Sequence, residues 1–116
     1  MNPFDYSLCR DTVTLYRRSG NTVTRQVVEH CHLHTRQVLH TDAAGKSMEK
    51  TFLLIIPGQA DLAPEDRVYR GIGPETVQWE SFTPVRIPAL YEISYVMPCY
   101  WNGAICHMQA GHKEGL

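Results

Sequence analysis

The sequence predicts an all-β protein, a small antiparallel β-barrel or sandwich from which one long hairpin protrudes. Apolar and polar residues alternate with a period of two in residues 11–16, 22–39 and 89–96, as in strands that bury one face. β-Branched residues crowd the longest of these segments, and turns rich in Gly, Pro or Asn separate them. In residues 22–39 the apolar positions do not follow the three-and-four spacing of a helix.

A chain of 116 residues can bury one compact core but is too short for two ordinary domains. We therefore expect a single barrel-like domain over residues 1–116, with residues 1–10 as an N-terminal arm and residues 109–116 as a flexible tail. A closed barrel is preferred to a sandwich because closure removes exposed strand edges from a small sheet.

The first half of the chain is expected to form three strands. Residues 11–16 form the first, and a turn at residues 19–21 leads into a long second strand over residues 22–39. A loop over residues 41–47 is the tip of an extended hairpin, and residues 52–56 return as a buried strand.

The second half is expected to form shorter strands. Residues 57–66 contain two prolines and little periodicity, so they form a connecting loop. Strands follow over residues 67–70, 76–79, 89–96 and 101–108. Several short strands separated by turns are typical of a small barrel or sandwich.

Composition excludes several classes of protein. A formal net charge of −1 gives no overall attraction to nucleic acid or to anionic membranes. The longest apolar run, residues 52–56, is far shorter than the roughly 20 residues that span a bilayer. The N-terminus lacks the basic-then-apolar order of a signal peptide, so we expect synthesis in the cytosol and no membrane partner. The cysteines should be reduced there: Cys9, Cys31, Cys99 and Cys106.

The histidines of the long second strand raise the question of a metal site. His30, His32 and His34 would share one face of a regular strand, where alternate histidines can bind one ion, but Cys31 would point the other way. Cys99, Cys106 and His107 match none of the usual ligand spacings. We expect metal-free cysteines and solvated or partner-facing histidines, with a zinc-binding protein as an alternative.

No catalytic constellation is evident. Cys106 and His107 are sequence neighbours, which point to opposite faces of a strand, so the histidine is poorly placed to activate the thiol. Residues 71–74 begin like a glycine-rich dinucleotide loop, but Pro74 and the lack of a following helix do not fit. We expect no enzyme, no catalytic residues and no cofactor.

Aromatic residues gather in the C-terminal half, where they could stack on nucleic-acid bases as in oligonucleotide-binding barrels. However, no Lys or Arg is interleaved with the aromatics of residues 91–101, and base-stacking surfaces need nearby cations to hold the phosphates. Roles in the core and at interfaces are therefore favoured, and a small nucleic-acid-binding β-barrel is an alternative.

The order of the segments resembles that of a known group. The relevant pieces are DTVTLY at residues 11–16, the long second strand with its Gly45-Lys46 loop, FLLIIP at residues 52–57, and Pro64-x-Asp66-Arg67-Val68-x-x-Gly71. The chain resembles, over residues 11–111, the small minor capsid or head–tail connector proteins of tailed bacteriophages and prophages. Glu65 stands where that group usually has Gly before the Asp, which puts the geometry of this turn in question.

The resemblance implies a structural protein of the virion, a ring-forming, stopper-like neck component between the portal and the tail. Its partners would be further copies of itself, portal or adaptor proteins and tail proteins. DNA would pass through the ring without sequence-specific binding. The protein would be made in the cytoplasm of the bacterial host and end in the virion.

The hairpin loop is the predicted assembly contact. It is small and polar, contains Gly and has nothing apolar to anchor it, so we expect it to be mobile in the isolated protein and ordered in the assembly. The residues of this loop are Asp42, Ala43, Ala44, Gly45, Lys46 and Ser47.

Overall fold

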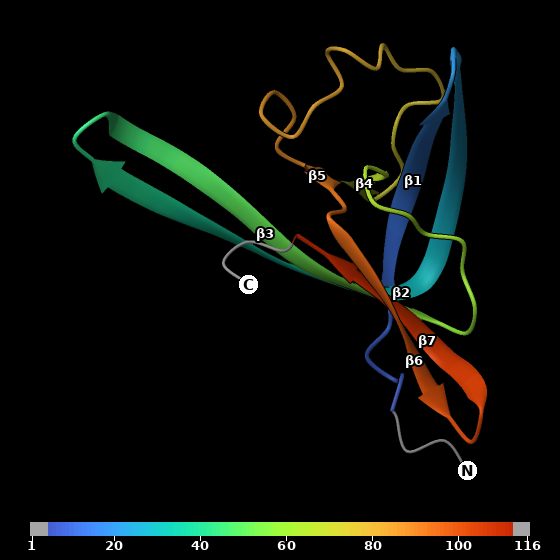
Figure 1. Ribbon diagram of the computed structural model, residues 1–116. Coiled ribbons are helices and arrows are strands. Elements are labelled where there is room, and N and C mark those ends of the chain that lie inside the picture. The colour runs from blue at the N-terminus through green and yellow to red at the C-terminus, as the bar shows by residue number, and fades with distance from the viewer. Residues whose placement is uncertain (1–4, 113–116) are drawn as a thin grey trace.

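The computed structural model describes residues 5–112, except for the side chains of His40, Asp42, Ser47 and Met48. Within these residues the chain forms seven antiparallel strands and no helix, as the sequence predicts (Figure 1). The strands are β1 (Asp11–Ser19), β2 (Thr22–Asp42), β3 (Gly45–Pro57), β4 (Arg67–Arg70), β5 (Leu90–Glu92), β6 (Tyr95–Trp101) and β7 (Ala104–Gly111).

The strands form one curled sheet, a half-barrel, in the order β5-β4-β1-β2-β3-β7-β6. The 21-residue strand β2 makes the curl possible because it serves two neighbours in turn. Its first part pairs with β1, and from His32 onward it pairs with β3. The two ends of the sheet therefore diverge from a shared middle strand.

A bulge bends β2 where it changes partner. The register with β1 shifts between Asp11 and Val13, and His30 takes a left-handed backbone conformation with φ of 58°. The Asp11 carboxylate accepts a hydrogen bond from the Leu33 N–H at 2.8 Å just past the bend. The bulge thus redirects the second half of β2 away from β1.

The predicted strand over residues 89–96 is two strands, β5 and β6, separated by Ile93 and Ser94. The Ile93 N–H donates to the Asp66 carbonyl and the Ser94 N–H to the Gly111 carbonyl, so the chain passes here from one end of the sheet to the other. β5 and β6 are the two edge strands of the sheet, and they do not pair with each other. The preference for a closed barrel was wrong in this respect, since the sheet remains open.

The main core gathers small and medium apolar side chains from most strands. Leu54, Val68 and Ile93 are among its least exposed members, each 1% exposed or less. The remaining buried members are Val13, Leu15, Cys31, Leu33, Phe52, Ile56, Leu62, Tyr91, Met108 and Ala110. Alternate residues of β3, Phe52, Leu54 and Ile56, enter this core, because successive side chains of a strand point to opposite faces of the sheet.

A second, smaller core lies beneath residues 71–89, which we call the strap. Phe82 of the strap packs with Tyr16 and Leu90, its ring centre 4.7 Å from that of Tyr16. The Arg67 guanidinium donates to the Trp79 and Phe82 carbonyls and lies 3.7 Å from the centre of the Trp79 ring. The predicted strand over residues 76–79 was wrong, because these residues form no ladder. The Gln78 carbonyl accepts from the N–H groups of Ser81 and Phe82, and the Trp79 carbonyl accepts from Arg67.

The C-terminal end of the sheet also differs from the prediction. Asn102 and Gly103 form a turn with φ of 53° and 80°, so the predicted strand over residues 101–108 starts on the wrong side of a hairpin. The predicted tail begins too early, because β7 continues through Gly111 between β3 and β6. Residues 113–116 of the tail and residues 1–4 of the N-terminal arm lie outside the described residues.

Candidate assembly surface

The most prominent surface feature is the outer part of the β2–β3 hairpin, which we call the arm (residues 35–52). Figure 1 shows it projecting far from the rest of the protein. Its register runs from Thr35 opposite Phe52 to Asp42 opposite Gly45, whereas β7 pairs with β3 only from Leu53 onward. Within the described residues, the two strands of the arm therefore form ladder pairs only with each other, and at the root the Phe52 carbonyl also accepts from the His112 N–H.

The tip of the arm is tighter than predicted. Only Ala43 and Ala44 form the turn, and Asp42 pairs with Gly45, which has φ of 122°. Lys46 and Ser47 already belong to β3, so the predicted six-residue loop was too long. Gly45 correctly marked the tip, but the ladder between β2 and β3 extends as far as the pair of Asp42 and Gly45. Mobility of this tip in the isolated protein stays a prediction.

The arm has a mixed surface. Leu39 is 55% exposed, and the side chains of Arg36 and Lys46 are also exposed. Exposed apolar and basic groups on a two-stranded ribbon can contact the surface of another protein. Two strands alone do not enclose a hydrophobic core that would stabilise the ribbon.

The root of the arm is fixed by contacts that the sequence did not reveal. The Lys50 ammonium lies 2.7–3.1 Å from four backbone carbonyl oxygens of residues 84–90. It also lies 4.5 Å from the centre of the Tyr91 ring. Burial lowers the pKa of Lys50. On the other strand, Thr35 is hydrogen-bonded to Arg70 of β4.

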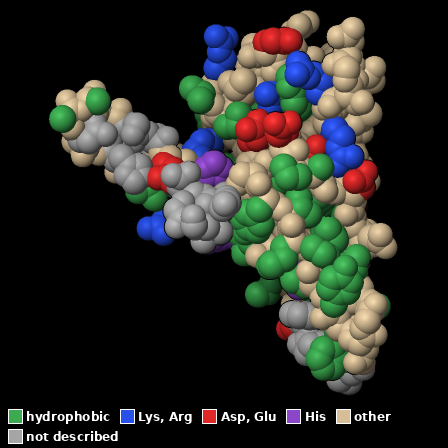
Figure 2. All heavy atoms as spheres, in the orientation of Figure 1, with side chains coloured by type: hydrophobic (Ala, Val, Ile, Leu, Met, Phe, Trp, Pro, Cys, Tyr) green, Lys and Arg blue, Asp and Glu red, His purple; other side chains and the backbone are tan. Residues whose placement is uncertain are grey.

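A second projection is the β6–β7 hairpin, at the lower end of the protein in Figure 1. Met97, Tyr100 and Trp101 are 43–60% exposed on β6, and apolar side chains gather over this region in Figure 2. Residues 93–112 contain no Asp, Glu, Lys or Arg, although 20% of the chain is charged. The aromatics noted in the sequence are thus divided between the cores and this exposed hairpin.

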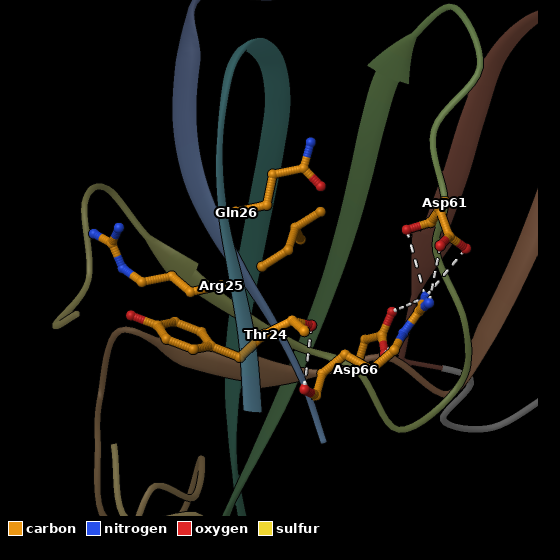
Figure 3. Close-up of a pocket in the computed structure, with 8 residues that line it drawn as sticks. Thr24, Arg25, Gln26, Asp61 and Asp66 are labelled. Carbon is orange, nitrogen blue, oxygen red and sulfur yellow. Dashed lines mark hydrogen bonds and ion pairs between the residues drawn. The ribbon is translucent and has the colours of Figure 1, made fainter. Parts of the chain in front are cut away.

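An open depression of about 350 Å³, lined by both polar and apolar side chains, lies beside β1 and β2 (Figure 3). Arg17 binds both carboxylate oxygens of Asp66 at 2.8 Å and one oxygen of Asp61 at 2.9 Å. These two carboxylates raise the pKa of Arg17. Arg25 donates to the backbone carbonyls of Gly73 and Pro74. Arg17 thus holds the connecting loop and Arg25 holds the strap, so both arginines that line the depression have structural roles.

The histidines and cysteines do not form a common site. His32 and His34 follow the bulge, while the left-handed conformation of His30 takes it out of their alternation. Cys31 is fully buried, and burial raises its pKa to about 11. Among the described side chains, which leave out those of His40 and Asp42, no group of three or more His, Cys, Asp or Glu is arranged to hold a metal ion.

His107 is a buried histidine, which the sequence analysis considered as a metal ligand and as a base beside Cys106. It is 5% exposed, and its Nδ1 lies 2.7 Å from the Tyr6 hydroxyl of the N-terminal segment. The two rings meet edge to face. Burial lowers the pKa of His107.

No protein family, curated protein or solved structure that was compared with this chain matches it. Over the part of the chain that the structure describes, no helix is long and apolar enough to cross a membrane.

Proposed function

We propose that this chain is a structural component of a tailed bacteriophage or prophage virion, a head–tail connector or minor capsid protein. Several copies would form a ring between portal and tail, through which DNA passes without sequence-specific readout. The arm is the observation that carries the proposal. An isolated two-stranded hairpin is at best marginally stable in water, so a long one gains from being covered by neighbouring subunits.

The segments that carry the resemblance also support the proposal. FLLIIP ends β3, and the Asp66–Gly71 segment forms β4, the next strand along the chain. Glu65, which stands where the group usually has Gly, has φ of 77°, a conformation that Gly adopts without strain. Glu65 thus adopts a backbone conformation in which Gly is the usual residue, which supports the resemblance at this turn.

Shortening the arm tests the proposal. Residues 38–49 would be deleted and Asn-Gly placed between Gln37 and Lys50, which are directly opposite in the ladder. We expect a folded protein, shown by unchanged circular dichroism. In complementation of a phage that lacks the gene, the resulting particles should fail to retain DNA or to join tails.

The matched control replaces only Ala43-Ala44 by Asn-Gly, which keeps the length of the arm and suits a two-residue turn. It should restore infectious particles. Normal titres from a folded, shortened-arm variant would contradict an assembly role for the arm. Salt-dependent DNA affinity of the isolated protein, or about one zinc per chain after purification, would instead support the nucleic-acid-binding or zinc-binding alternatives.

A further inference from the structure

The root of the arm contains a lysine that is enclosed by another part of the chain. Lys50 lies on β3 opposite Gln37. Its Nζ contacts the carbonyl oxygens of Pro84 at 3.1 Å, Ile87 at 3.1 Å, Pro88 at 3.0 Å and Leu90 at 2.7 Å. Three N–H donors are thus shared among four acceptors, and the Tyr91 ring lies against the same cation.

The segment that encloses Lys50 depends on the cation for its own shape. The four carbonyl dipoles converge on one point, and such an arrangement is unfavourable unless a positive charge occupies that point. This segment is the end of the strap and the start of β5, and β3 contacts β5 at this place. The conformation of the end of the strap and the position of the arm are therefore linked through one ammonium group.

Other contacts also hold the root of the arm. Arg70 of β4 binds Thr35 on the opposite strand, and Phe52 packs in the main core beside Tyr91, with its carbonyl accepting a hydrogen bond from the His112 N–H at 3.4 Å. Further out, within the described residues, β2 and β3 form ladders only with each other. A two-stranded ribbon of this kind can swing about its root unless side chains at the root prevent it.

We propose that Lys50 is a positioning residue that locks the arm at one angle to the half-barrel, so that the arm and the end of the strap move as one rigid unit. A lock of this kind presents the arm already oriented and lowers the entropy lost when it docks. It leaves the tip at Ala43 and Ala44 able to flex. The inference concerns the isolated protein and does not depend on the proposed function.

Residual dipolar couplings of the backbone amides test the lock. In the native protein, arm and half-barrel should fit one alignment tensor. In Lys50→Met, the couplings of residues 36–49 should fall to about half of their native size or less, as for a segment that swings, while those of the half-barrel persist. Lys46→Met is the matched control, because Lys46 lies four residues away on the same face of β3 and is exposed. It should leave all couplings unchanged.

Couplings of the Lys50→Met arm that still fit the tensor of the half-barrel would overturn the proposal. A second measurement uses the native protein, so it does not depend on the folding of a variant. The side-chain ammonium of Lys50 in the native protein should give a ¹⁵N resonance with slow proton exchange, unlike that of the exposed Lys46. Exchange at Lys50 as fast as at Lys46 would equally overturn the lock.

Discussion

Three side-chain-bearing residues, His30, Glu65 and Asn102, adopt the left-handed backbone region at places where the chain changes direction. This conformation costs an L-residue roughly 1–2 kcal/mol relative to the right-handed region. At His30 the surrounding ladders of β2 compensate for the cost, since β1 and β3 hold the strand on either side of the bulge. At Glu65 the N–H bonds the Ile93 carbonyl at 2.8 Å, which fixes the turn before β4.

The conformation of His30 gives a prediction about stability. His30→Gly should leave the free energy of unfolding unchanged or raise it by up to about 1 kcal/mol, because Gly adopts this φ without strain. His30→Val should lower it by about 2 kcal/mol, because a β-branched residue is least tolerated there. Urea unfolding measures both. His34→Val, at an exposed position in the paired part of β2, is the control, and an equal loss in it would refute the explanation.

His107 gives a prediction about pH. Because burial lowers its pKa in the folded state, the unfolded chain binds a proton more readily below the ordinary value of 6.5. Stability should therefore decrease as the pH falls from about 6.5 towards the lower folded-state pKa, where the ring must become charged in its buried site. His107→Gln should show a smaller decrease in melting temperature between about pH 7 and 5, while His34→Gln should retain the native dependence. A native protein whose stability does not change over this interval would contradict the prediction.

At the scale of elements, the sequence predicted the strands of the first half well. Period-two alternation located β1 and β2, the apolar run at residues 52–56 located the end of β3, and Gly45 marked the tip of the β2–β3 hairpin. The second half was harder because its segments are fixed by contacts that are distant in sequence. The strap looks like a strand at residues 76–79, yet Arg67 and the second core hold it as irregular chain. The contacts of Lys50 could not be predicted, because its partners are backbone carbonyls, which any residue type supplies and which leave no signal in the sequence.

The attachment of the strap can be tested at Gly73. The Thr14 hydroxyl accepts a hydrogen bond from its N–H, and a Cβ at this position would collide with the Tyr16 hydroxyl, which donates to Pro74 at 2.6 Å. Gly73→Ala should therefore cost about 1–3 kcal/mol of stability. In a Tyr16→Phe background the same change should cost about 1 kcal/mol less, because the colliding oxygen is gone. Strictly additive losses in urea unfolding would show that the collision is relieved elsewhere.

At the scale of the whole molecule, the protein is elongated, 51 Å along its longest axis against 24 Å along its shortest. Its half-barrel is completed by a strap, and its arm and its uncharged β6–β7 hairpin project from it in different directions (Figure 1). A subunit with two separate projections can contact different neighbours with each, and such head-to-tail contacts generate rings when the rotation closes. This geometry supports the proposed role as a connector.

The most direct test of the proposed connector role is a cryo-electron microscopy reconstruction of the neck of phage particles produced from the genome that carries this chain. The account predicts density for the half-barrel in a closed ring between portal and tail, with each arm against an adjacent subunit and at a single angle to its own half-barrel. Particles that are complete and infectious without the chain, or a ring in which the arms contact nothing, would contradict it.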